Sequence, residues 1–157
     1  MHTITKAVAT GATSLALIGL PTGSALASDG GGGSTYTSNG STIIKIGKYG
    51  TLSRTHNLAW VNVKVTCSPD VSDASLTATL AQVTNGNAQV STGTVAAFNA
   101  FECNGREEWV SVPIRRPLGG FKWVKGKARV FDVCFATYDP GNGWTNDFAS
   151  GRTITLR

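Results

Sequence analysis

The chain is predicted to form an all-β domain, an immunoglobulin-like antiparallel sandwich of about seven strands. Short runs rich in Val, Thr, Ile and aromatic residues alternate apolar and polar side chains with a period of two. Clusters of Gly, Asn, Pro and Asp separate these runs, and helical periodicity is scarce. A small closed β-barrel is the alternative architecture, because short strands at this spacing also suit a barrel.

The first 42 residues are predicted to lie outside the folded domain. Residues 1–27 have the parts of a secretory signal peptide: Lys6 is followed by an apolar run, and Ala25-Leu26-Ala27 forms the cleavage site. Gly, Ser and Thr dominate residues 28–42, where we expect a flexible leader. No later stretch has the length of a membrane span. We therefore expect a secreted protein with one domain over residues 43–157.

The clearest predicted strand covers residues 58–67 and alternates strictly, so one face packs and the other is solvated. Five further strands with a simple pattern are expected, at residues 43–46, 74–82, 88–99, 107–114 and 152–156. The side chains expected to point into the core are Val61, Val63, Val65, Cys67, Ala74, Leu76, Ala78, Leu80, Gln82, Val110, Val112 and Ile114.

The run at residues 127–138 is different, because it is apolar on both faces. Its first two cations share a face with later apolar residues, and the opposite face is apolar as well. Such a strand is central in its sheet or covered on its second face, or it contains a bulge that exchanges the faces.

Three cysteines follow the predicted signal peptide: Cys67, Cys103 and Cys134. A secreted protein is expected to form one disulfide from them and to keep one thiol. Cys67 and Cys103 each end a run just before a turn signal, so they could meet at one pole. Cys67 with Cys134 would instead mimic the cross-sheet bridge of antibody domains. The residues alone leave both pairings open.

Several short motifs together resemble a group of small secreted bacterial β-sandwich proteins that is known only as a domain of unknown function. They are VNVKVTC, a strand ending in Gln82, ECNG, a Trp-Val-Ser-Val strand, and Phe121 followed by Gly126-Lys127-Ala128. The resemblance spans residues 58–156 and implies a Cys67–Cys103 disulfide. Cys134 departs from the pattern, and we expect it to be a buried, inert thiol.

No catalytic residues, cofactor or metal are expected. His56 is the single histidine after the predicted signal peptide, and no nucleophile-elbow motif is present. Glu107 and Glu108 are adjacent in a predicted strand, so their side chains point to opposite faces. Residues 139–147 are rich in oxygen ligands, but their spacing does not match a calcium loop. We expect a polar hairpin connection there.

The most basic segment is RRPLGGFKWVKGKAR, residues 115–129. The whole chain has a net charge of +5, and loss of Lys6 would leave about +4. In one interpretation the segment is a turn that enters a charged strand, with Trp123 in the core. In the other, alternate cations form a row that binds a polyanion. The candidate anion-binding residues are Arg115, Arg116, Lys122, Trp123, Lys125, Lys127 and Arg129.

The expected function is a non-catalytic binding or envelope-associated module with a basic surface. Its expected partner is an anionic cell-wall polymer or a lipid surface, and not a specific nucleic acid, since no base-reading motif occurs. The oligomeric state is not predicted. The alternative is a small-ligand carrier or enzyme inhibitor, by analogy with immunoglobulin-like carriers, with Trp109 and Trp144 as contacts.

Overall fold

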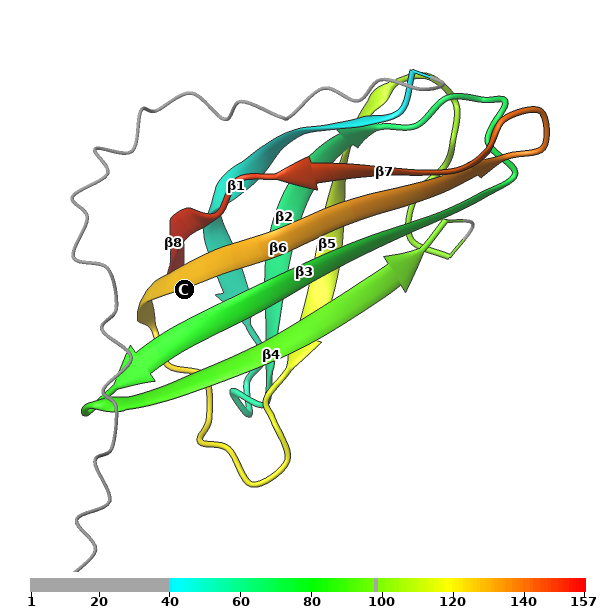
Figure 1. The fold of residues 1–157 in the computed structure, drawn as a ribbon. Helices are drawn as coiled ribbons and strands as arrows, with labels where there is room; N and C mark the ends of the chain where they lie inside the picture. Colours follow the sequence, from blue (N-terminus) through cyan, green and yellow to red (C-terminus); the bar gives the residue numbers. More distant parts are fainter. Residues whose placement is uncertain (1–39, 98) are drawn as a thin grey trace, which may run out of the picture.

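One continuous sheet of eight strands accounts for residues 40–97 and 99–157, which the computed structural model describes (Figure 1). The predicted signal peptide and nearly all of the predicted leader lie outside the described residues. The strands are β1 (Thr42–Leu52), β2 (Leu58–Thr66), β3 (Asp73–Thr84), β4 (Asn87–Ala96), β5 (Glu107–Arg115), β6 (Gly126–Asp139), β7 (Gly143–Ala149) and β8 (Arg152–Leu156).

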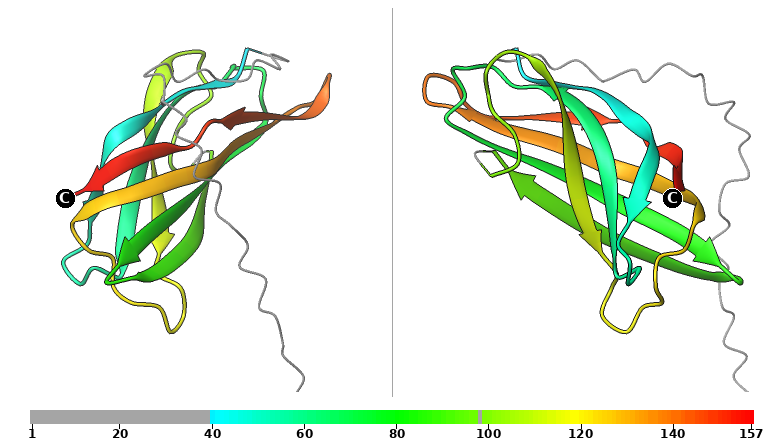
Figure 2. Two further views of the ribbon diagram at one scale, coloured as in Figure 1. Left: turned by 60° about the vertical axis from the view of Figure 1, so that its left-hand side comes forward. Right: turned by 180° about the vertical axis from the view of Figure 1, so that it is seen from behind.

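The sheet curls into a nearly closed barrel. The strand order is β4-β3-β6-β8-β1-β2-β5, and β7 pairs with β6 beyond the short β8. All pairs are antiparallel except β1 with β8, which run parallel. The views in Figure 2 show the curled sheet from two further sides. The all-β prediction is confirmed and the barrel alternative fits, whereas the sandwich is not confirmed.

The barrel closes where β4 meets β5 without a ladder of hydrogen bonds. A Cβ atom on Gly93 would lie 2.1 Å from the carbonyl oxygen of Pro113, so the two backbones are in direct contact. β5 is the last strand in the hydrogen-bonded order, so one of its edges has no strand to bond to. Pro113 of β5 suits such an edge because proline has no N–H group to donate. Gly93 of β4 and Pro113 of β5 therefore form the contact at which the barrel closes.

The core follows the alternation predicted from the sequence. β2 buries every second residue, and β3 and β5 bury their predicted inward residues as well. All twelve residues predicted to point inward are at most 2% exposed. Apolar burial of this kind is the main term favouring the folded state.

A bulge in β6 exchanges the faces of that strand. Two steps along β3, from Thr77 to Thr79, correspond to three steps along β6, from Cys134 back to Phe131. The extra residue lies beside Asp132, which has a positive φ of 48°. Beyond this point Val133 is buried and Cys134 lies on the outer face, half-exposed. This bulge explains why both faces of the run looked apolar. The prediction of a buried Cys134 was wrong.

β7 occupies a segment that was expected to be only a polar connection. The turn is confined to residues 140–142, and pairing with β6 resumes at Gly143.

A buried carboxylate on β7 is hydrogen-bonded to the start of β1. Asp147 Oδ2 accepts hydrogen bonds from the Ile43 amide at 2.6 Å and the Thr42 hydroxyl at 2.7 Å. The ordered contacts of the described chain thus include Ser41, which is buried, and Thr42, the first residue of β1.

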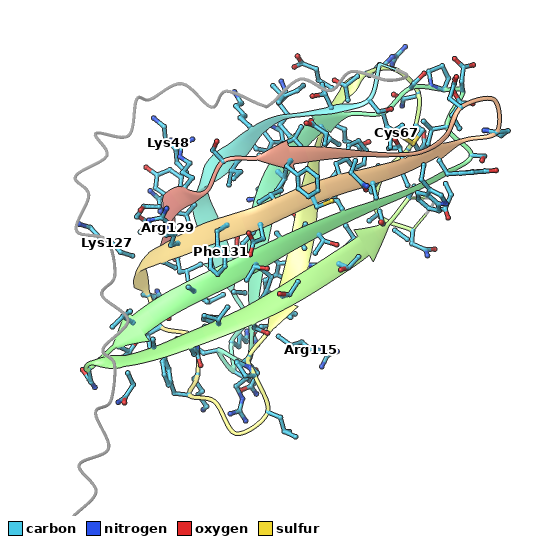
Figure 3. The ribbon with its side chains drawn as sticks, viewed as in Figure 1. Lys48, Cys67, Arg115, Lys127, Arg129 and Phe131 are labelled. Atoms are coloured by element: carbon cyan, nitrogen blue, oxygen red, sulfur yellow. A yellow bond between two sulfur atoms is a disulfide. The ribbon has the colours of Figure 1, made fainter. Side chains whose placement is uncertain are left out.

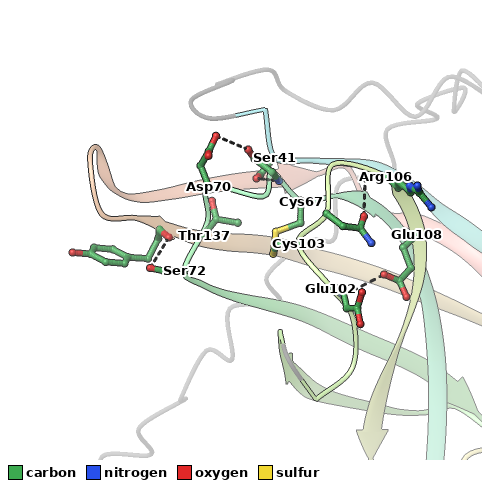
Figure 4. The surroundings of a disulfide bond; sticks show 12 residues. Ser41, Cys67, Asp70, Ser72, Glu102, Cys103, Arg106, Glu108 and Thr137 are labelled. Atoms are coloured by element: carbon green, nitrogen blue, oxygen red, sulfur yellow. Dashed lines mark hydrogen bonds between the residues drawn. A yellow bond between two sulfur atoms is a disulfide. The ribbon is translucent and has the colours of Figure 1, made fainter.

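A disulfide joins Cys67 to Cys103, the pairing that the resemblance implied (Figure 4). It ties the end of β2 to the long connection between β4 and β5. The Gly105 amide donates to the Cys67 carbonyl at 2.8 Å, and the Ser68 amide donates to the Ser41 hydroxyl at 2.9 Å. The bridge therefore anchors two loops and the start of β1 at one end of the barrel.

Replacement of both bridged cysteines by alanine (C67A/C103A) is expected to lower the free energy of unfolding by up to about 4 kcal/mol, because the closed loop restricts the unfolded chain. The sequence separation is 36 residues. Guanidinium unfolding followed by circular dichroism measures the loss, with C134A as the control. Equal stability of C67A/C103A and C134A would contradict a stabilising role for the bridge.

Candidate functional site

Charged side chains are separated along the barrel axis. One end, where β1, β3 and β5 finish and β2, β4 and β6 begin, is called the basic pole, and the opposite end is called the acidic pole. Among the described residues no Asp or Glu side chain lies in the strand ends or loops of the basic pole. Its cations are Arg54, Arg115, Arg116, Lys122, Lys125, Lys127, Arg129 and Arg157. The acidic pole holds Asp70, Asp73, Glu102, Glu107, Glu108 and Asp139, together with the cations Lys64 and Arg106, while Asp132 and Asp147 lie within β6 and β7.

Trp123 is not part of the anion-binding surface. It is fully buried, and its indole Nε1 donates to the Ile114 carbonyl at 3.2 Å. Its backbone amide donates to the His56 carbonyl at 2.9 Å. The side chain closes the barrel core at the basic pole. The inclusion of Trp123 among the candidates is therefore corrected, because an indole without exposure offers no contact to a ligand.

The remaining candidates divide into two groups. Lys127 and Arg129 point outward from the start of β6, as alternate residues of one strand do. Arg115 lies at the end of β5, on a different side of the barrel (Figure 3). Three more cations, Arg116, Lys122 and Lys125, are exposed on the connection between β5 and β6.

The β6 cations meet cations from β1 and β8. Lys127 pairs with Thr155 of β8, and Thr155 pairs with Tyr49 of β1, so three strands share one row. The guanidinium carbon of Arg157 lies 3.2 Å from the centre of the Tyr49 ring. Figure 3 shows Lys48 on the same side as the two β6 cations. We call Lys48, Lys127, Arg129, Arg152 and Arg157 the basic face.

A long bulge in β1 hollows the surface beside this face. Ile46 pairs with Val63 and Gly50 with Val61, so three residues of β1 stand opposite Asn62 alone. Arg152 satisfies a carbonyl freed by the bulge, because its Nη1 donates to Ile46 O at 3.0 Å. The result is a groove of about 540 Å³. Its lining consists of Lys45, Ile46, Gly47, Lys48, Tyr49, Asn62, Trp109 and Arg152.

Two aromatic rings line the groove, and each has a cation nearby. Tyr49 is 47% exposed and Trp109 is 48% exposed. The Lys45 ammonium lies 5.6 Å from the Trp109 ring centre, within cation–π range. The site thus combines aromatic surface with positive charge.

Glu107, whose carboxyl is influenced by Lys45 of the groove lining, is already paired. Glu107 forms an ion pair with Lys64, which is the one ion pair among residues 40–97 and 99–157. The hydrogen bond from Lys64 and then its positive charge hold the pKa of the Glu107 carboxyl below the usual value. Lys45 adds a smaller effect in the same direction. The basic face lacks any such carboxylate partner within the described part of the chain.

The other polar residues considered for catalysis or metal binding are held in separate local contacts. His56 lies in the turn between β1 and β2 with a positive φ of 58°. Asp139 caps its own turn, since the Gly141 amide and the Asn142 side chain donate to it at 2.7 and 2.8 Å. Asp147 is bound to β1 instead. Within the described residues no three His, Cys, Asp or Glu side chains gather as a metal site would require.

Trp109 and Trp144, both predicted as ligand contacts of a carrier, lie on different strands, β5 and β7. Trp109 lines the groove beside β1. Trp144 lies on β7, where its ring centre is 5.3 Å from that of Tyr138. The Trp109 indole therefore lies beside Lys45, and the Trp144 indole lies beside Tyr138.

The groove and much of the basic face were missed from the sequence. Lys48, Arg152 and Arg157 stand far apart in the chain, and only the parallel pairing of β1 with β8 brings them together. One signal was present: two glycines and two lysines surround a tyrosine in residues 45–50, KIGKYG. Glycine inside a strand pattern often marks a bulge.

Comparison with protein-family models, with curated protein sequences and with solved structures gives no match for this chain. The family that the cysteine motifs resemble stays a prediction, although the implied disulfide is present.

Replacement of Trp123 by alanine is expected to lower the free energy of unfolding by about 3–5 kcal/mol, because it leaves a large cavity and removes the indole hydrogen bond to the Ile114 carbonyl. The neighbouring change Lys122→Ala should stay within about 0.5 kcal/mol, as is usual for an exposed side chain. Guanidinium unfolding followed by far-ultraviolet circular dichroism compares the two. Equal midpoints would contradict a core role for Trp123.

The free thiol of Cys134 is expected to react slowly at neutral pH. Burial, and then the negative charge of Asp147, raise the pKa of this thiol above its usual value. The thiolate is the nucleophile, so alkylation by iodoacetamide should accelerate only at a pH above that of an ordinary cysteine. The same protein in guanidinium is the control. Identical pH profiles for native and unfolded protein would contradict the expectation.

Proposed function

We propose that this protein is a secreted, non-catalytic module that binds an anionic polymer of the cell envelope through its basic face. The observation that carries the proposal is the separation of charge between the two poles. Cations from β1, β6 and β8 gather on one side of the barrel, and none of them forms an ion pair among the described residues. An uncompensated group of cations attracts polyanions and speeds their association.

A repeating polyanion fits this surface better than a single small anion. Lys127 and Arg129 are two residues apart on β6, a separation of about 7 Å. Lys127 and Tyr49 are separated by one strand, so the row continues across the sheet at about 5 Å per strand. Lys127, Arg129 and the Arg157 guanidinium over the Tyr49 ring thus offer several separate charges to a polymer, and each contact adds to the salt dependence.

Secretion is supported by the disulfide, since such bonds persist in oxidising compartments. The described residues contain no helix suited to crossing a membrane. The predicted signal peptide over residues 1–27 would supply export. A secreted protein with a basic face would meet the anionic polymers of the cell surface first.

The test is retention on purified cell wall, with elution by a salt gradient. The variant K48E/K127E/R129E reverses three charges of the basic face. It should bind about 100-fold more weakly, because each cation near an anionic surface contributes about 1 kcal/mol. The matched control R115E/R116E/K122E has the same net charge but leaves the basic face intact, and a loss of about tenfold or less is expected.

Two outcomes would contradict the proposal in different ways. If wild type and both variants elute at one salt concentration, the protein is not a polyanion-binding module. If the two variants lose the same affinity, net charge rather than the basic face governs binding. Thermal unfolding of each variant shows that its fold is retained.

A further inference from the structure

The groove beside the basic face has the chemistry of a sugar site. We infer that it seats one sugar ring of the bound polymer, so that the ligand is an acidic glycan rather than a polyanion without sugars. This inference rests on the proposed function. It adds a chemical class of ligand, which charge alone does not specify.

The size and lining of the groove suit a sugar ring. Its volume of about 540 Å³ falls within the range of about 300–1,000 Å³ that is usual for small-molecule sites. A sugar ring has apolar C–H faces and polar hydroxyl edges. Tyr49 and Trp109 supply exposed aromatic surface for the faces, each remaining about half exposed (47% and 48%) despite the cation nearby.

Polar groups at the edge of the groove suit hydroxyl and carboxylate oxygens. The side-chain oxygen Oδ1 of Asn62 already accepts a hydrogen bond from the Ser111 hydroxyl at 2.7 Å. Its amide nitrogen has only a long contact of 3.5 Å, to the Tyr49 carbonyl, so its donors remain accessible to a ligand. Arg152 uses Nη1 for the Ile46 carbonyl and keeps further N–H donors, and Lys48 is exposed.

Gly47 lines the groove at a position where a side chain would crowd Asn62 and Trp109. A Cβ atom on Gly47 would lie 3.1 Å from Asn62 O and 3.6 Å from Trp109 Cζ3. A larger side chain at this position would fill the space beside the indole. A polyanion held by charge alone would not require that space.

The experiment measures the affinity of the mature protein for two polyanions by isothermal titration calorimetry at one salt concentration. Polygalacturonate carries a carboxylate on each sugar, and long-chain polyphosphate carries charge without sugars. Trp109→Ala should weaken polygalacturonate binding about tenfold, through lost aromatic contact, and should change polyphosphate binding less than about twofold. Trp144→Ala, which removes an exposed indole away from the groove, should alter neither affinity.

Gly47→Val is a second test of the sugar site, because it adds a side chain to the groove lining without removing an aromatic ring or a charge. It should reproduce the selective loss of polygalacturonate binding, with circular dichroism and thermal unfolding as checks of the fold. Equal losses for both polymers in W109A, or no loss in either, would overturn the sugar site.

The variant K48E/K127E/R129E separates the two claims. Weaker binding of both polymers by this variant supports the proposed function whatever W109A does. If the wild type binds neither polymer, both the proposed function and the sugar site are contradicted.

Discussion

The strict alternation of side chains along each strand, interrupted at a few bulges, determines which residues of this barrel face the core and which face outward. β2, β3 and β5 keep one phase throughout, and their apolar residues fill the interior. β6 changes phase beside Asp132, so Val133 continues the core while Cys134 moves outside. β1 loops out by two residues, which opens the groove and frees the Ile46 carbonyl for Arg152.

The charge distribution is a second consequence of the strand order. Segments that are distant in sequence deliver a group of cations without carboxylates to one pole and most of the carboxylates to the other. The paired charges lie toward the acidic pole, where Lys64 and Glu107 meet across β2 and β5. At the basic pole, electrostatic repulsion among cations is an unfavourable term that a bound polyanion would relieve. The same arrangement would orient the protein relative to an anionic surface before contact.

Most of the barrel core could be predicted from the sequence because alternation is a local signal. The alternation of residues 58–67 identified β2 and its buried valines without any knowledge of neighbouring strands. The phase change in β6 could not be located, because the residues around Asp132 are apolar on both sides of it. β7 was missed since glycines and polar residues dominate its start, and its pairing with β6 depends on tertiary context.

The candidate site was less predictable than the core, because non-local pairing creates it. Six cations lie in the segment 115–129, which composition alone reveals, but only Lys127 and Arg129 of them belong to the basic face. Because β6 begins at Gly126, Lys127 and Arg129 lie on the strand, whereas Arg116, Lys122 and Lys125 lie on the connection before it. Trp123 shows the limit of composition: an aromatic ring among cations suggested a surface, yet its indole nitrogen bonds to the Ile114 carbonyl inside the barrel.

The parallel pairing of β1 with β8 has a practical consequence for attaching other groups to this domain. Because these two strands run in the same direction, the chain enters at Gly40 near the acidic pole and reaches Arg157 at the basic pole. A tag or dye fused after Arg157 would stand beside Tyr49 and obstruct the groove, since Arg157 itself lies over that ring. A domain immobilised through the residues before Gly40 would instead present its cationic end to the surrounding solution.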